Sequence, residues 1–445
     1  MKKQIKLYIF IISVLLAMVF TFSLTYVIME NVSQRKQAAL AQSYKEKIDS
    51  YEEQLKNFED GQNLGIFSSI AELYNSLPKE DRNEELYYKL ALIDYYYRIK
   101  YANEIDEDAL VYSVLNGYIV GAGDRYGEYY TADDFKSVTD ESQGNTVGIG
   151  VYVNYSQEYN AIKILSVMEN SPAHKAGIKT GDIITHINGE SVSEMGYYVA
   201  LDKVKGDEGT EVELTLYRNG ESITVKAVRA KVETETVFYH QYEFDKTIGV
   251  IRIVDFNNVM PEQFKSAIGD LMKKGVKSLV FDLRNNPGGT LSSVIDILDY
   301  LLPEGNIAHI TDADGKVLQT YTSNANHLTG IESMAVLVNE NTASAAELFT
   351  CALKDYNMAT IVGVNTYGKG SMQTVYMLAD GTGLRLTTNK YNPPKSENYD
   401  GVGIKPDIEV ELSEALAGKS HFEYTDAEDN QLQEACNAIK ANKQN

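Results

Sequence analysis

The strongest constraint on the fold is an alternation of short apolar strands and intervening helices from Lys246 onward. Strands are expected at Ile248–Phe256, Ser278–Leu283, Ile307–Thr311, Met334–Val338 and Ala359–Val364, and helices at Pro261–Lys274, Thr290–Leu302 and Ala343–Tyr356. Such an alternation is typical of proteins in which helices cover a sheet. The sequence therefore predicts an α/β-layer core over residues 233–412, followed by a helical tail over residues 413–445.

Upstream of this core, between residues 141 and 232, the pattern changes to short strands separated by turn residues. One strand is expected at Val147–Tyr155 and a helix at Tyr198–Lys205, and Asn219-Gly220 predicts a hairpin turn. These features predict a compact β-rich module. Residues 63–140 instead have helical periodicity, which predicts a helical region that leads into the core.

The N-terminus bears on membrane attachment. Lys2, Lys3 and Lys6 precede an uncharged apolar run from Leu7 to Met29, which is long enough to cross a hydrocarbon layer of about 30 Å as a helix. A cleavable signal peptide has a shorter apolar run followed by a small-residue cleavage site, and neither is seen here. We therefore expect residues 1–30 to be an uncleaved signal anchor, a single transmembrane helix with its N-terminus inside.

The polar segment that follows, residues 31–62, is expected to be a helical stalk because apolar side chains recur in it with heptad spacing. These side chains are Ala41, Tyr44, Ile48, Tyr51, Leu55 and Phe58. Two interpretations remain open. The stalk either pairs two copies of the chain in a homodimer or lies as one amphipathic helix on its own domain.

Charge and cysteine content exclude several classes of function. Lys and Arg total 41 against 63 Asp and Glu, so the formal net charge is −22, which makes a nucleic-acid partner a poor candidate. The two cysteines, Cys351 and Cys436, lack the spacing of a zinc site. The sequence therefore implies neither a metal nor an organic cofactor.

Three segments contain residues suited to chemistry. FDLRNNPGGT, ending at Thr290, runs from a buried strand into a glycine turn and a helix, so the N–H groups near Gly288 can face an oxyanion. NENTASAAELF places Ser344 in the first turn of a helix, where the helix dipole favours developing negative charge. TYGKGSMQ places Lys369 ahead of a strand, with Gln373 on the same face.

Each segment alone has an ordinary explanation: a strand-to-helix turn, a capping serine or an exposed lysine. Together they suggest a serine nucleophile with a lysine general base. A lysine can take the serine proton only when neutral, so desolvation must lower its pKa from about 10.4 towards about 7–8.

In these segments the sequence resembles the C-terminal processing peptidases, also called tail-specific proteases. The matching stretches are DLRNNPGG, NTASAAE, YGKGSMQ and GVGIKPDIEV, and the resemblance extends from about Leu110 to Ala438. It implies a crotonase- or Clp-protease-like core that performs serine endopeptidase chemistry outside the cytoplasm. The implied roles are Ser344 as nucleophile, Lys369 as base, Gln373 as the group that orients the base, and the Gly288 and Ala345 N–H groups as oxyanion donors.

The resemblance also implies that the β-rich module is an inserted PDZ domain. The loop Val147-Gly148-Ile149-Gly150 would then grip the free C-terminal carboxylate of a protein or peptide substrate. Lys205-Gly206 stands where family members often have Arg-Gly, which keeps the charge but loses bidentate pairing.

Two alternatives differ in function class. One is a catalytically silent PDZ adaptor on a peptidase scaffold, which would give no acyl-enzyme. The other is a crotonase-like acyl-thioester enzyme, which would bind coenzyme A thioesters. A histidine-based triad is not favoured, because none of the six histidines lies in these motifs.

Overall fold

The computed structural model describes residues 77–78, 83–416 and 419–442. The described residues divide into two compact units. One holds those up to Val114 with Met377–Thr382, and the other holds Leu115–Tyr376 with the described residues from Gly383 onward. The expected signal anchor (residues 1–30) and stalk (residues 31–62) lie outside the described residues. Within the described part of the chain, no helix is long and apolar enough to span a bilayer.

Two helices follow the undescribed N-terminal segment, α3 (Glu84–Lys100) and α4 (Glu107–Gly121), in agreement with the predicted helical region. The side chain of Asn83 caps α3 by accepting a hydrogen bond from the Leu86 N–H group, 3.0 Å away. Tyr88, Ile93 and Tyr96 of α3 are more than half exposed. Helix α3 therefore exposes both aromatic and aliphatic side chains.

The core contains a six-stranded sheet in the order β10-β11-β12-β15-β16-β19. Its strands are β10 (Val237–Gln241), β11 (Ile248–Ile253), β12 (Ser278–Asp282), β15 (Ser333–Val338), β16 (Ala359–Gly363) and β19 (Ile408–Glu409). All neighbours pair in parallel except β10 and β11, which are antiparallel. The predicted α/β layer is confirmed.

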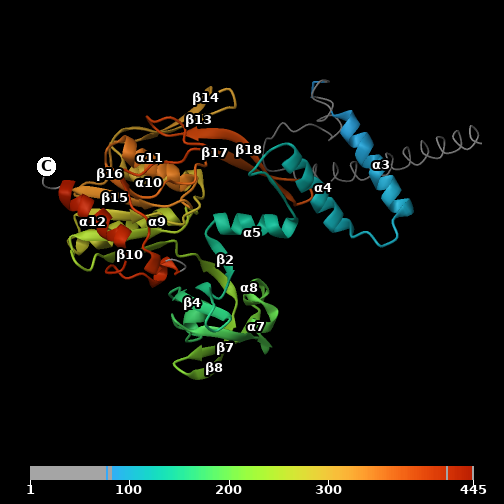
Figure 1. The fold of residues 1–445 in the computed structure, drawn as a ribbon, viewed down its shortest axis with the longest axis horizontal. Helices are drawn as coiled ribbons and strands as arrows, with labels where there is room; N and C mark the ends of the chain where they lie inside the picture. Colours follow the sequence, from blue (N-terminus) through green and yellow to red (C-terminus); the bar gives the residue numbers. More distant parts are fainter. Residues whose placement is uncertain (1–76, 79–82, 417–418, 443–445) are drawn as a thin grey trace, which may run out of the picture. The chain divides into compact units, whose positions relative to one another are not determined.

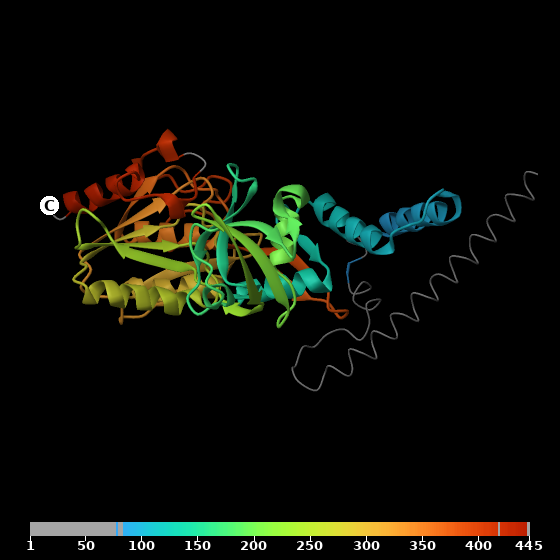
Figure 2. The ribbon, with the colours of Figure 1, turned by 90° about the horizontal axis from the view of Figure 1, so that it is seen from below.

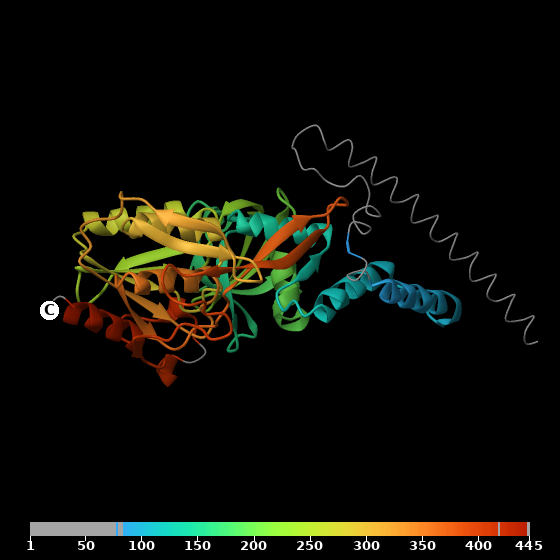
Figure 3. The same ribbon diagram turned by 90° about the horizontal axis from the view of Figure 1, so that it is seen from above.

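Helices cover both faces of this sheet, because its strands are apolar on both sides. Helices α9 (Met260–Lys273), α10 (Leu291–Leu301) and α11 (Ala345–Asp355) pack with one set of strand residues, and α12 (Asn430–Asn442) packs with the alternate set. Figure 2 and Figure 3 show α9 and α12 on opposite sides of the strands. The predicted tail helices are represented by α12 and two short 3₁₀ turns.

A second sheet departs from the predicted element order. It runs β1-β18-β13-β14, with β17 paired to β18, and comprises β1 (Glu128–Tyr130), β13 (Gly305–Thr311), β14 (Val317–Ser323), β17 (Ser371–Met377) and β18 (Gly383–Asn392). β1 is a strand that the sequence did not predict within the helical region over residues 63–140, and α5 (Ala132–Ser142) follows it. Its partner β18 lies far away in the chain, and such tertiary pairing leaves little local signal.

The β-rich module contains a sheet in the order β3-β4-β5-β7-β8, with β6 paired to β5. These strands are β3 (Val151–Ser156), β4 (Ala161–Val167), β5 (Ile183–Ile187), β6 (Glu190–Ser191), β7 (Glu211–Arg218) and β8 (Glu221–Val228), and three helices accompany them: α6 (Pro172–Lys175), α7 (Val192–Met195) and α8 (Tyr197–Val204). Figure 1 shows them as one compact group. Asn219 and Gly220 both have positive φ in the predicted β7–β8 hairpin.

The predicted strand Val147–Tyr155 is interrupted. Its first part is β2 (Asn145–Gly148), which pairs with β9 (Ala230–Glu233), and β3 begins only at Val151. Gly150 adopts φ 77°, and a Cβ atom there would lie 2.4 Å from Ser171 Cβ. The glycine therefore bends the chain between two different pairings.

Candidate active site

The glycine turn after β12 brings backbone close to the serine segment. Gly288 and Gly289 adopt φ 108° and 142°. A Cβ at Gly289 would lie 2.5 Å from the Phe256 carbonyl oxygen, and one at Gly288 would lie 2.7 Å from Ser344 Cβ and 2.9 Å from Ala345 N. Side chains cannot be accommodated at these distances, so glycine at both positions is what permits the close approach.

The two predicted oxyanion donors differ in their present partners. The Gly288 N–H group donates to Asn286 Oδ1 at 2.8 Å, and the Asn286 amide itself donates to the Ile253 carbonyl at 2.7 Å. Ala345 is the first residue of α11, so its N–H group has no acceptor within the helix. An oxyanion would therefore have to displace Asn286 Oδ1 from the Gly288 N–H group. The sequence did not indicate this competing acceptor.

Ser344 occupies a strained backbone position immediately before α11. It is the N-cap residue with φ 57° and ψ −121°, whereas the sequence predicted a place inside the first helical turn. Such a conformation costs a non-glycine residue about 1–3 kcal/mol and is found mainly where function requires it. The Ser344 N–H group donates to Glu347 Oε2 at 2.9 Å.

Glu347 connects Ser344 by hydrogen bonds to the loop that carries Lys369. Its fully buried side chain also accepts hydrogen bonds from the Thr366 hydroxyl at 2.6 Å and from the N–H groups of Gly368 at 2.7 Å and Lys369 at 2.8 Å. Burial raises the pKa of Glu347 against the opposing effect of these donors. Glu347 belongs to NTASAAE, but its role was missed because sequence spacing does not reveal a shared acceptor.

Lys369 lies in the loop between β16 and β17, ahead of a strand as the sequence predicted. Its Nζ atom is 4.6 Å from the centroid of the Tyr126 ring. Burial lowers the pKa of Lys369, the nearby Arg385 guanidinium adds to this effect, and Glu347 opposes it. This is the direction that a lysine base requires. Among the described side chains, no hydrogen bond joins Lys369 Nζ to Ser344 Oγ.

Gln373 contacts a different set of groups from the one predicted. Its Nε2 atom donates to Ser371 Oγ at 3.1 Å and to Thr387 Oγ1 at 3.2 Å. Within the described residues it makes no hydrogen bond to Lys369. Its proposed orienting role stays a prediction.

Tyr391 of β18 was not identified from the sequence. Its hydroxyl donates to the Lys369 carbonyl at 2.5 Å, and burial raises the pKa of this phenol, partly offset by a hydrogen bond with the Ser344 side chain. The position has no motif of its own, because only the pairing of β18 with β13 and β17 brings it to the site.

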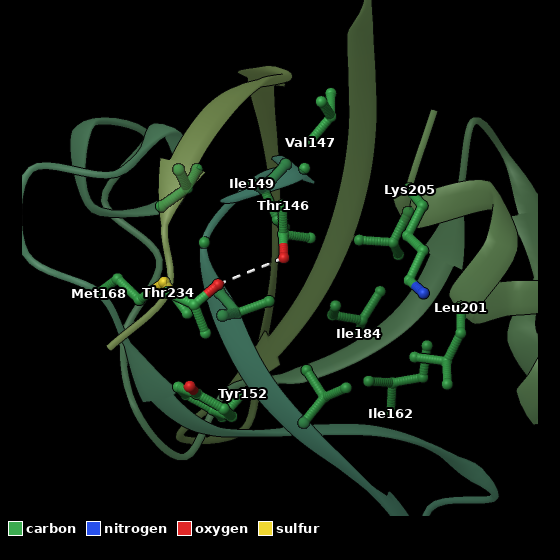
Figure 4. A pocket seen from close by; sticks show the side chains of 16 residues that line it. Thr146, Val147, Ile149, Tyr152, Ile162, Met168, Ile184, Leu201, Lys205 and Thr234 are labelled. Atoms are coloured by element: carbon green, nitrogen blue, oxygen red, sulfur yellow. Dashed lines mark hydrogen bonds between the residues drawn. The ribbon is translucent and has the colours of Figure 1, made fainter. Parts of the chain in front are cut away.

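The β-rich module contains a cavity of about 230 Å³. Its lining includes the predicted loop residues Val147, Gly148, Ile149 and Gly150, together with Lys205. Figure 4 shows Ile162, Ile184 and Leu201 across the cavity from the labelled loop residues. β3 pairs only with β4 among the described strands, so its other edge is available for an added strand.

The end of α8 beside this cavity is fixed by Arg229. This buried guanidinium donates to the carbonyl oxygens of Val204 at 3.0 Å and Lys203 at 2.6 Å. A Cβ at Gly206 would lie 2.9 Å from Arg229 Nε. The Lys205-Gly206 pair therefore packs against Arg229, an arginine from another part of the same module.

Comparisons with known proteins identify the family. Residues 247–410 match the family model of peptidase family S41, and residues 163–218 match a PDZ domain model. A Staphylococcus aureus protein (strain COL) named a CtpA-like serine protease is 34% identical over 348 residues, which cover 77% of this chain and 68% of that protein. The chain belongs to peptidase family S41.

Further relatives agree with this assignment. A Staphylococcus saprophyticus protein of the same name is 33% identical over 313 residues, covering 70% of this chain and 63% of its own length. A solved structure from Bacteroides fragilis shares the fold with a TM-score of 0.53 at 17% identity, covering 74% of this chain and 90% of that one. The chain thus spans about two thirds of these curated relatives.

This S41 chain is therefore a serine-type peptidase that carries a PDZ domain. Membership of a peptidase family argues against the alternative that the chain is a crotonase-like acyl-thioester enzyme. The two cysteines are buried, and burial raises the pKa of Cys351 to about 12, so this thiol is a core group rather than a nucleophile.

Proposed function

We propose that this peptidase is a membrane-anchored serine endopeptidase that binds protein C-terminal tails in its PDZ domain and cleaves peptide bonds with a Ser344–Lys369 dyad. The observation that carries the proposal is the shared buried acceptor: Glu347 binds the backbone N–H groups of both Ser344 and Lys369. The nucleophile and the base are thereby tied to one carboxylate.

In the proposed reaction, neutral Lys369 takes the Ser344 hydroxyl proton while Ser344 Oγ attacks the peptide carbonyl carbon. The N–H groups of Gly288 and Ala345 hold the developing oxyanion, which requires Gly288 to leave Asn286. Protonated Lys369 then gives its proton to the departing amine. Water attacks the resulting ester while Lys369 accepts its proton. Lys369 then returns that proton to Ser344 Oγ as the acid product leaves, which restores the free hydroxyl and the neutral amine.

A fluorophosphonate probe tests the catalytic part of this proposal. We expect wild-type chain to be labelled on Ser344, and Ser344→Ala to lose both the label and peptide cleavage. Ser292, which lies exposed in the first turn of α10, is the matched control, so Ser292→Ala should be labelled like wild type. An unlabelled, inactive wild-type chain would favour the silent-adaptor alternative.

Tail recognition is expected to depend on the free carboxylate. Successive N–H groups of the Val147–Gly150 loop would hold it while the tail pairs with β3. A peptide with an amidated C-terminus should therefore bind at least about tenfold more weakly than its free acid, measured by fluorescence anisotropy. Equal affinities would remove the carboxylate-gripping role from this loop.

Membrane attachment and self-association complete the proposal. The apolar run Leu7–Met29 would anchor the chain, with the catalytic part outside the cytoplasm. A homodimer would form through the stalk and the terminal helices, and the exposed side chains of α3 would offer a further apolar surface for self-association. Sedimentation of the full chain in detergent distinguishes a dimer from a monomer.

A further inference from the structure

The amine of Lys369 rests on a residue outside the motifs that define the proposed dyad. Its Nζ atom lies 4.6 Å from the centroid of the Tyr126 ring. Tyr126 belongs to the turn Asp124–Gly127, which connects α4 to β1. A cation at this distance from an aromatic ring is attracted by the negative face of its π system.

This turn is fixed to the second sheet through Asp124. The carboxylate accepts hydrogen bonds from the N–H groups of Tyr126 at 3.1 Å and Gly127 at 3.0 Å, within the turn. It also accepts from the N–H group of Thr387 at 2.8 Å and from the Thr387 hydroxyl at 2.7 Å. The backbone that carries Tyr126 therefore has a defined place beside β18.

The same threonine connects the turn to Gln373. Gln373 Nε2 donates to Thr387 Oγ1 at 3.2 Å, and that hydroxyl donates to Asp124. Gln373, predicted to orient Lys369, is therefore hydrogen-bonded to the threonine that holds the Tyr126 turn in place and not to Lys369.

A second cation, the guanidinium of Arg125, also lies near the Tyr126 ring. Arg125 Nη2 donates to the Tyr367 hydroxyl at 2.7 Å, and the Arg125 guanidinium carbon lies 5.6 Å from the Tyr126 ring and 5.5 Å from the Tyr367 ring. Burial and a hydrogen bond with Tyr367 raise the pKa of Tyr126. The phenol is therefore neutral near pH 7, and its ring acts on the lysine by its π face.

We propose that Tyr126 is a positioning residue for the lysine base, holding the protonated amine of Lys369 on its ring and shielding it from water. The inference rests on the proposed function, in which Lys369 is the general base. The attraction is specific to the ammonium form, so it weakens when Lys369 loses its proton to solvent. The neutral amine is then released to accept the Ser344 proton.

The two effects of the ring on basicity have opposite signs. Exclusion of water disfavours the ammonium and lowers the pKa of Lys369, whereas attraction by the π face favours it and raises the pKa. Two charged groups also shift the pKa of Lys369, Arg385 of β18 and Glu347 of α11. Arg385 Nε donates to the Tyr126 carbonyl at 2.9 Å, and Glu347 accepts from the Lys369 N–H group at 2.8 Å, so neither contact requires the Tyr126 side chain. Because the base must be neutral, activity rises as pH passes upward through this pKa.

The test is the pH profile of kcat/KM for peptide cleavage by the full chain in detergent. Tyr126→Phe keeps the ring and should keep the wild-type midpoint of the acidic limb. Tyr126→Leu keeps apolar cover but removes the π face, so the midpoint should fall by up to about one pH unit. Tyr126→Ala admits water, and its midpoint should lie above that of the leucine variant.

Equal midpoints in wild type, Tyr126→Phe and Tyr126→Leu would overturn the inference, even if the rates differed, because a merely structural role changes rate without moving the midpoint. If the leucine variant fails to fold, Tyr126→Met supplies the same comparison. A failure of the proposed dyad gives a different result from a failure of the Tyr126 role. If Lys369 is not the base, Lys369→Met remains active, regardless of the midpoints of the Tyr126 variants.

Discussion

Replacing Lys369 with methionine is expected to lower kcat for peptide cleavage by about 10²- to 10⁴-fold, the usual contribution of a general base. Methionine keeps a long, unbranched side chain over the Tyr126 ring but has no proton acceptor of useful basicity. Single-turnover cleavage of a peptide with a free C-terminal carboxylate, followed by mass spectrometry, measures the loss.

The matched control is Lys390→Met on β18, whose lysine side chain is 52% exposed. It should cleave within about twofold of wild type, because exposed ion pairs contribute little to stability. Circular dichroism should give the same unfolding midpoint for both variants. A Lys369→Met variant as active as the control would rule out the dyad.

The wild-type pH profile follows from the direction of the lysine shift. Burial lowers the pKa of Lys369 below its usual value near 10.4, so the neutral fraction becomes appreciable at lower pH than for a surface lysine. Activity should therefore rise with pH through this lowered pKa. A profile that falls over that range would identify a group that acts in its protonated form instead.

The elements that sequence predicted well are those with local signals. The central strands are continuous apolar runs, so β11, β12, β15 and β16 could be placed from sequence. Asn219-Gly220 likewise specified its own turn. The second sheet was harder, because β1 forms only by pairing with β18, which lies far away in the chain.

The residues of the candidate site likewise fall into those with a local sequence signal and those that only the fold brings together. Ser344, Lys369 and the glycine turn lie in recognisable motifs, whereas Tyr126 and Tyr391 reach the lysine only through the fold. The Asn286 side chain that occupies the Gly288 N–H group is also invisible to a motif. Sequence motifs contain groups capable of chemistry, but tertiary structure determines the hydrogen-bond partners of those groups.

The second large effect is expected in the ion network that joins the glycine turn to the C-terminal helix. Arg284, which lies in the turn, is buried and donates to Asp282 at 2.7 Å and to Asp429 at 2.6 Å. Asp429 immediately precedes α12, whose Leu432 N–H group donates to the same carboxylate at 3.0 Å. The network therefore holds the tail helix against the segment that carries Gly288.

Asp429→Ala should lower the free energy of unfolding by about 3 kcal/mol, because it leaves a buried guanidinium with one carboxylate instead of two. Chemical unfolding monitored by circular dichroism measures this change. Glu428→Ala is the matched control, since that carboxylate is 49% exposed, its ion pair with Lys419 spans 3.8 Å, and its hydrogen bonds are made only to nearby Thr425 among the described residues. The control should change stability by less than about 0.5 kcal/mol.

The network should also make stability depend on pH in a defined direction. The guanidinium groups of Arg252 and Arg284 hold the pKa of Asp282 well below its usual value, against the opposing effect of burial. Its stabilising contribution is therefore fully present above the unfolded pKa of about 3.9 and is lost as pH falls below that value. Asp429→Ala should weaken this acid dependence, because it loosens Arg284, the group that holds Asp282 ionised. An unchanged acid limb together with unchanged stability would show that Asp282 and Arg252 suffice to hold the turn without the tail helix.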